Sequence, residues 1–211
     1  MGLRLVMRSI AGIALAVGML GSGMVALHPA AAAQPAVDRT SESAVNISFD
    51  DAFVQQMFKA GVFMYGSSEV GVYMSDSGSL TARFPLTGQS SNRPTTAMSV
   101  DGEVGGLSLY NGPAEATAGL LGIGIRRTGT TGIVNARVIG PYSAESGQFS
   151  QTMTVFAISA ARAKRMPSGW TVRGTLTLTA QGASTLNTLL RTTVFTTGGP
   201  IGSLDAAVVS R

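Results

Sequence analysis

The sequence has 211 residues, with 15 basic and 11 acidic side chains, no cysteine and a single histidine. A chain without cysteine can form no disulfide framework, thiol redox centre or thiolate metal site. The formal net charge of +4 reflects a small basic excess on a chain with few charges, and the basic residues are scattered. This composition does not indicate a nucleic-acid-binding protein.

The N-terminal segment, residues 1–33, has the three parts of a secretory signal peptide. Arg4 and Arg8 form a positive start, residues 10–27 are uncharged and mostly apolar, and a run of alanines then leads to Gln34. We predict cleavage before Gln34 and a protein that is secreted, either extracellular or associated with the cell envelope. The alternative is an uncleaved anchor, because the apolar run approaches the length that spans a bilayer. Its glycines and the alanines that follow favour cleavage.

A polar, flexible leader is expected at 34–44, and a single domain at 45–211. Alternating apolar positions predict a strand at 45–49. Asp50 is placed to begin a short helix with one apolar face, and Gly61 is placed to stop it. Short strands separated by glycine- and serine-rich turns are expected next, at 62–65, 70–74, 80–84, 97–104 and 107–110.

The second half of the domain also reads as strands. They are expected at 114–126, 133–139, 152–158, 170–178 and 201–209. The glycines in the first of these argue against a helix and leave two alternatives, one strand with bulges or a pair of strands. The third is expected to lead into a polar, basic turn ending at Pro167. Thr179 is a good N-cap for a second short helix. About ten short strands and two short helices predict a mainly β fold, a two-sheet antiparallel β-sandwich-like domain preceded by the signal peptide.

Four segments of the domain resemble a known family. They are L-T-A-R-F-P-L-T-G (80–88), D-G-E-V-G-G-L-S-L (101–109), L-T-L-T-A-Q-G-A-S-T-L-N-T-L-L (176–190) and G-G-P-I-G-S-L-D-A-A-V-V (198–209). Together they resemble the HtaA-like, or haem transport-associated, domain of actinobacterial secreted and cell-surface proteins. The resemblance covers nearly the whole domain. Each segment also has a structural explanation; Gly105 and Gly106, for example, can relieve crowding at a bulge or a close approach of strands.

The resemblance implies haem binding through a tyrosine ligand that a histidine supports. This sequence departs from that pattern, because its only histidine, His28, lies in the predicted signal peptide. A phenolate can still ligate haem iron, so the weak candidates for a haem ligand are Tyr65, Tyr73, Tyr110 and Tyr142. Packing in the core or on the sheet is the alternative for each of them. The resemblance implies haem as a cofactor, whereas the residues taken by themselves indicate no cofactor.

The residues argue against catalysis. After cleavage the chain has neither histidine nor cysteine, so it contains no Ser-His-Asp or Cys-His arrangement and no ordinary zinc site. Asp101 and Glu103 form the best acidic pair, and a solvated strand face explains them as well as a weak cation site does. We expect a non-catalytic domain that binds an unidentified envelope or extracellular partner or contributes to surface structure. We expect no catalytic or metal site, no nucleic-acid partner and no membrane contact after cleavage.

The densest basic cluster is formed by Arg162, Lys164 and Arg165. It lies in the expected turn that ends at Pro167, and no aromatic residue is interleaved with it. A solvated loop is therefore the simplest interpretation of these three cations.

Overall fold

The computed structural model describes residues 43–67, 69–74, 79–86, 97–143, 147–167 and 169–209. Within them, residues 97–104, 142 and 143 are described by their backbone alone. All of these residues belong to one compact unit of the chain. The predicted signal peptide and most of the predicted leader lie outside the described residues, so both stay predictions.

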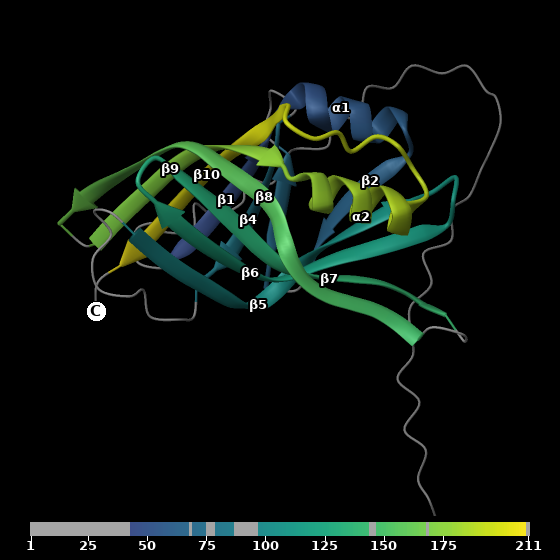
Figure 1. Cartoon of the computed structure of the whole chain (residues 1–211), viewed down its shortest axis with the longest axis horizontal. Coiled ribbons are helices and arrows are strands. Elements are labelled where there is room, and N and C mark those ends of the chain that lie inside the picture. Colours follow the sequence, from purple (N-terminus) through teal and green to yellow (C-terminus); the bar gives the residue numbers. More distant parts are fainter. Residues whose placement is uncertain are drawn as a thin grey trace, which may run out of the picture. The chain divides into compact units, whose positions relative to one another are not determined.

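The described residues form ten strands and two helices (Figure 1). The strands are β1 (Ala44–Phe49), β2 (Val62–Gly66), β3 (Gly71–Met74), β4 (Leu80–Pro85), β5 (Ala97–Asn111), β6 (Ala116–Thr128), β7 (Thr131–Ser143), β8 (Gly147–Met166), β9 (Gly169–Leu178) and β10 (Pro200–Val209). The helices are α1 (Asp51–Lys59) and α2 (Ala180–Leu190). The prediction of a mainly β domain with two short helices is confirmed.

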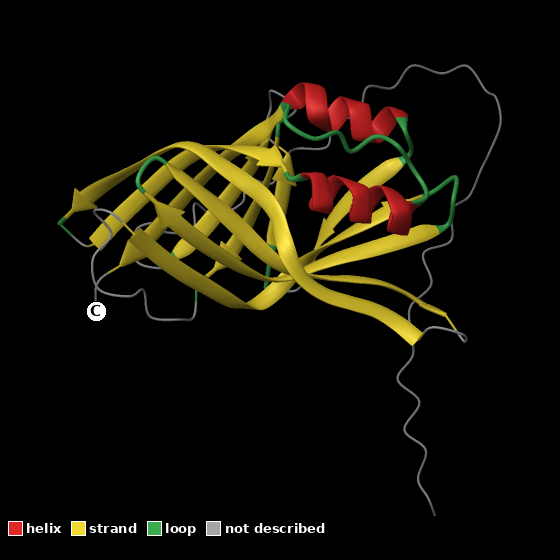
Figure 2. Cartoon of the chain, in the orientation of Figure 1, coloured by secondary structure: helices red, strands yellow, loops and turns green. Residues whose placement is uncertain are grey.

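The strands form one sheet, and the prediction of two sheets is wrong. Their order is β2-β5-β6-β7-β8-β9-β10-β1-β4-β3, and every neighbouring pair is antiparallel. Each of the strands from β5 to β9 pairs with the next one in the chain, and β10 and β1 continue the same hydrogen-bonded ladder. β4 and β5, each next to an end of this order, also contact each other, so the sheet curls until it is nearly closed (Figure 2). The number and spacing of strands cannot distinguish such a curled sheet from a sandwich, because both bury alternate side chains.

The first strand lies between the last strand and β4. Ala44 is opposite Ala207 in β10 and Pro85 in β4, and Phe49 is opposite Gly202 and Leu80. Gly202 has φ of +156° and lies so close to Ser48 that a Cβ atom there would collide with the Ser48 carbonyl. The G-x-x-x-G segment at 198–202 therefore serves a close approach of two strands.

The two helices begin and end where the sequence predicts. Asp50 occupies the N-cap position of α1 without a side-chain capping bond, and Gly61 follows the helix with φ of +74°. Thr179 is the N-cap of α2 and makes a side-chain capping bond: its hydroxyl oxygen accepts from the Gly182 backbone N–H at 2.9 Å. α1 buries Phe53, Val54 and Met57, and α2 buries Gly182, Ala183, Leu186 and Leu190.

An aromatic cluster connects α1 to the sheet and to the segment after α2. The ring centroid of Phe53 lies 5.9 Å from that of Phe49 in β1 and 6.2 Å from that of Phe195. Asn187 in α2 holds Phe195 at both backbone groups: its side-chain amide donates to the Phe195 carbonyl at 2.8 Å, and its oxygen accepts from the Phe195 N–H at 3.1 Å. The segment after α2 is thus fixed to that helix without regular secondary structure.

Three strands depart from their predicted extent. The two strands expected at 97–104 and 107–110 are one strand, β5, whose register with β6 shifts between Gly102 and Gly106. β7 continues through residues expected to form a loop. The basic turn expected before Pro167 is wrong, because those residues belong to β8, where alternate side chains at Ala161 and Ala163 pack toward the core. Pairing with β9 keeps this polar segment extended, and sequence patterning does not show that pairing.

Candidate functional site

The interior of the curled sheet is filled by side chains. The cavity found there has a volume of about 10 Å³, close to the smallest space that holds one water molecule. Its lining is entirely apolar and consists of Phe49, Phe53, Met64, Leu109, Leu120, Phe156, Leu178, Leu186 and Phe195. A ligand as large as a tetrapyrrole has no room among these residues, so a candidate site must lie on the outer face of the sheet.

The predicted tyrosines lie on different parts of the sheet. Tyr65 in β2 is 52% exposed, and Tyr110 in the neighbouring β5 is half-buried. Tyr73 is 37% exposed in β3, the strand at the other end of the sheet order. The Tyr142 backbone belongs to β7, and its side chain lies outside the described residues. The structure therefore brings Tyr65 and Tyr110 together and leaves Tyr73 apart from them in the strand order.

Tyr65 and Tyr110 belong to an exposed aromatic patch, defined here as Phe58, Phe63, Tyr65 and Tyr110. Phe63 lies directly opposite Tyr110 across the β2–β5 pair, and its ring centroid is 5.8 Å from that of Phe58 at the end of α1. Phe58 and Phe63 are 37% and 40% exposed. Four aromatic side chains from two strands and a helix thus gather on the outer face, where the hydrophobic effect provides no reason to keep them.

A hollow of about 430 Å³ lies farther along the same strands. It is lined by Ser67, Glu69, Gly105, Gly106, Leu121, Gly122 and Arg137. These residues come from the turn after β2 and from β5, β6 and β7. The hollow coincides with the register shifts of β6 against β5 and β7, where bulges interrupt the regular cover of side chains.

The glycines of the hollow allow the turn after β2 to lie against β5. Ser67 and Gly106 exchange two hydrogen bonds: the Ser67 N–H donates to the Gly106 carbonyl, and the Gly106 N–H donates to the Ser67 hydroxyl, each at 3.0 Å. A Cβ atom at Gly106 would lie 2.6 Å from the Leu120 carbonyl and would also collide with Leu121. Gly105 has φ of +86°, and a Cβ there would meet Val70 at 2.7 Å. The predicted close approach at Gly105-Gly106 is confirmed.

The patch and the hollow form one continuous surface, which we call the outer strip. Tyr65 is opposite Ser108, and Ser67 at the edge of the hollow follows two residues later, in the turn after β2. Ser108 is opposite Gly119, which is opposite Ile139 in β7. The next row toward the hollow runs from Gly106 through Leu121 to Arg137. Tyr65 and Arg137 therefore stand on one face of the sheet, and the side chains of Leu121 and Ile139 cover the glycines between them.

The strip offers charged groups that can bind a ligand. Glu69 and Arg137 face the hollow, and no ion pair joins them among the described residues. The same residues contain no cluster of three or more histidine, cysteine, aspartate or glutamate side chains that could hold a metal ion. The acidic pair Asp101 and Glu103 lies in β5, but its side chains fall outside the description.

Sequence reasoning missed the two phenylalanines of the patch. Phe63 stands between Val62 and Met64 in a run of apolar residues, so the pattern does not show which of the three faces outward. The pairing of Phe63 with Tyr110 could be found only from the register of β2 against β5.

None of the helices in the described part of the chain has the length and apolar character needed to cross a membrane. No family model matches the sequence, and no curated protein matches it at a significant level.

Solved structures with a similar fold do exist. The C-terminal domain of HtaA from Corynebacterium glutamicum matches with a TM-score of 0.56 and 12% sequence identity, over 78% of this chain and 96% of that domain. The N-terminal domain of the same protein matches with a TM-score of 0.53 and 13% identity, over 81% of this chain and 98% of that domain. A domain-swapped dimer of a histidine-to-alanine variant of the C-terminal domain matches with a TM-score of 0.51 and 11% identity, over 75% of this chain and 91% of that one. The resemblance to the HtaA-like domain is thus confirmed as a likeness of fold.

Proposed function

We propose that this protein is a non-catalytic binding domain that acts outside the cytoplasm and takes its ligand on the outer strip. The observation that carries the proposal is the exposed aromatic patch that continues into the hollow. The interior, with its cavity of about 10 Å³, offers no alternative site of useful size. A role outside the cytoplasm rests on the predicted signal peptide at 1–33 and on the absence of cysteine and of a recognisable catalytic set from the processed chain.

The chemistry of the strip favours a flat, largely apolar ligand with an acidic edge. Aromatic side chains bind planar rings by stacking or edge-to-face contact. Arg137 at the hollow can pair with a carboxylate through its planar guanidinium. Leu121 and Ile139, which cover the glycines between Tyr65 and Arg137, would add apolar contacts to such a ring system.

Haem or a related tetrapyrrole is the specific ligand that we propose to test. The fold shared with HtaA domains supports it, and so does the phenol of Tyr65, which could serve as the iron ligand. Arg137 would hold a propionate. Ligation by histidine or cysteine is excluded, because the processed chain contains neither residue.

The test is a haemin titration of the exported chain, followed by its Soret band. Tyr65→Phe and Tyr110→Phe remove the two phenols of the patch, and Tyr73→Phe is the matched control at the other end of the sheet order. We expect a saturable, shifted band that Tyr65→Phe weakens at least about tenfold in affinity, as loss of a metal ligand should, and that Tyr73→Phe leaves unchanged.

A spectrum equal to the sum of free haemin and protein would contradict the haem proposal and leave the broader binding role. A second titration with an iron-free porphyrin separates recognition of the ring from ligation of the metal. Binding of the porphyrin that survives Tyr65→Phe but is lost when Phe63 is changed to serine would place an apolar planar ligand on the patch. Turnover of any substrate by the purified protein would contradict the non-catalytic role.

A further inference from the structure

The basic residues expected in a solvated turn stand on the β8–β9 hairpin. β8 pairs with β7 up to Ile158, and with β9 from Phe156 to Met166. From Arg162 onward, no strand of the described residues pairs with the other edge of β8. This last part of the strand is therefore held by β9 alone and exposes its outer face and one edge.

Four basic side chains lie on this hairpin, and one of them pairs with a carboxylate. Arg162 and Lys164 alternate with Ala161 and Ala163, which pack toward the core, so both cations point outward. Arg173 in β9 lies directly opposite Arg162 and forms an exposed ion pair with Asp205 at 2.8 Å. Arg165, the fourth cation, is exposed two pairs from the turn.

The tip of the hairpin adds apolar surface beside these charges. Trp170 is opposite Arg165, whose guanidinium carbon lies 5.9 Å from the centre of the Trp170 ring. Met166 is 40% exposed next to the turn, and Pro167 follows it. Trp170 thus lies beside Arg165 near the tip, on the face of the hairpin opposite to Arg162 and Lys164, so the tip carries cations on both faces.

An apolar tip with a tryptophan, flanked by lysine and arginine, matches the chemistry of a membrane interface. Tryptophan prefers the headgroup level of a bilayer, and each nearby lysine or arginine gains free energy from anionic lipids. A soluble polyanion would be recognised by the cations alone and would leave Met166 and Pro167 in water. We propose that the β8–β9 hairpin docks the protein peripherally on the surface of an anionic lipid bilayer. This departs from the expectation that the cleaved chain has no membrane contact.

The only tryptophan of the chain lies in this hairpin and reports directly on the contact. The exported chain is titrated with vesicles of phosphatidylglycerol and phosphatidylcholine in equal parts, and with vesicles of phosphatidylcholine alone. We expect the fluorescence of Trp170 to shift to shorter wavelength with the anionic vesicles only. Added salt should weaken the binding, because exposed charges are screened.

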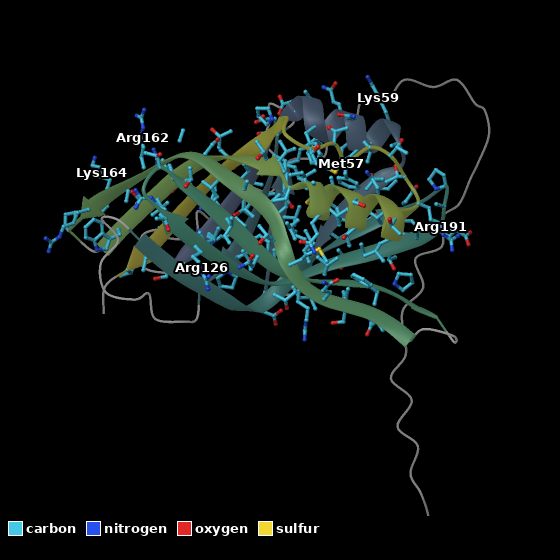
Figure 3. All side chains as sticks on the ribbon, in the orientation of Figure 1. Met57, Lys59, Arg126, Arg162, Lys164 and Arg191 are labelled. Atoms are coloured by element: carbon cyan, nitrogen blue, oxygen red, sulfur yellow. The ribbon has the colours of Figure 1, made fainter. Side chains whose placement is uncertain are left out.

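A double variant, Arg162→Gln with Lys164→Gln, removes two outward cations and leaves Trp170 and Arg165 in place. Each cation near an anionic surface contributes about fivefold in partitioning, so this variant should bind about twentyfold more weakly. The matched control, Lys59→Gln with Arg191→Gln, makes the same change in net charge at the ends of the two helices, away from the hairpin (Figure 3). It should bind as the unchanged protein does, and Met166→Ser should weaken binding without changing the charge.

Several outcomes would overturn the proposal. Equal losses in the double variant and its control would mean that net charge alone drives binding. Binding to soluble polyphosphate with no vesicle binding would assign the cations to a polyanion. If no variant changes the Trp170 signal but the double variant aggregates, the cations only protect the open edge of β8 from pairing with other chains.

Discussion

The inner and outer faces of the same curled sheet differ in how closely their side chains are packed. The inner face is packed so closely that the cavity left in it is about 10 Å³, whereas the outer strip keeps a hollow of about 430 Å³, three exposed aromatic side chains and the half-buried Tyr110. Stability is concentrated on the inner face, where large apolar side chains meet. Recognition is available on the outer face, where glycines and bulges interrupt the cover of side chains. Substitutions should therefore separate stability from binding according to the face that they change.

The largest loss of stability is expected at the inner face. Leu186 is 2% exposed and lines the small cavity, so Leu186→Ala should lower the free energy of unfolding by about 2–5 kcal/mol. Urea denaturation measures the change. Ser184→Ala alters an exposed position of the same helix and should stay near zero. A loss below ~1 kcal/mol at Leu186 would show that the interior relaxes to fill the gap.

A smaller loss of stability is expected at the position in the outer strip where only glycine fits. Gly106→Ala places a Cβ against the Leu120 carbonyl and Leu121, which should lower the free energy of unfolding by roughly 1–3 kcal/mol. Gly199→Ala is the matched control, because nothing lies within 4 Å of its added Cβ. Thermal unfolding of the two variants compares them. Equal melting temperatures would mean that the turn after β2 moves away from β5 without penalty.

The two helix starts offer a finer comparison. Thr179→Ala removes a hydroxyl that accepts from the Gly182 N–H at 2.9 Å and lies 2.7 Å from the Thr154 carbonyl, so it should reduce stability by about 1–2 kcal/mol. Asp50→Ala removes a side chain that makes no capping bond and should have an effect of about 0.3–1 kcal/mol, from the helix dipole alone. Urea denaturation of both variants, with Thr179→Ser as the conservative control, tests this order. The reverse order would show that α1 depends on its N-cap more than α2 does.

The smallest change in stability is expected on the hairpin. Arg173 is an exposed partner of Asp205, and exposed ion pairs contribute about 0–1 kcal/mol. Arg173→Gln should therefore leave the urea midpoint nearly unchanged while it weakens binding to anionic vesicles. A large drop in the urea midpoint, together with unchanged vesicle binding, would show that Arg173 stabilises the fold and does not contribute to vesicle binding.

Features encoded by local chemistry could be predicted from the sequence. Thr179 precedes a helix whose apolar residues recur at helical spacing, and the structure places it at the N-cap with its capping bond. The bulged strand at 114–126 was indicated by its glycines, and β6 shifts register between Leu121 and Gly124. In both cases the residues that determine the feature lie within a few positions of it in the sequence.

Features that depend on which strands meet could not be predicted. The single sheet follows from the pairing of β1 with β10 and β4, and nothing in the spacing of the strands shows that choice. The same holds for the candidate site: Phe63 meets Tyr110, and Trp170 meets Arg165, only through the registers of their strands. The turn before Pro167 was predicted wrongly for the same reason, because the pattern of these residues does not show that β9 pairs with them.

The position of β1 between β10 and β4 affects when the sheet can be completed during synthesis of the chain. Its neighbour β10 lies far from it in the sequence, and the pairs Ala44–Ala207 and Phe49–Gly202 close a loop that contains nearly the whole domain. Pairings between residues so distant in sequence form slowly. The ladder between β9 and β4 therefore stays incomplete until β10 has been synthesised. In the export that we propose, such a delay would keep the polypeptide extended during translocation, and the sheet would be completed afterwards.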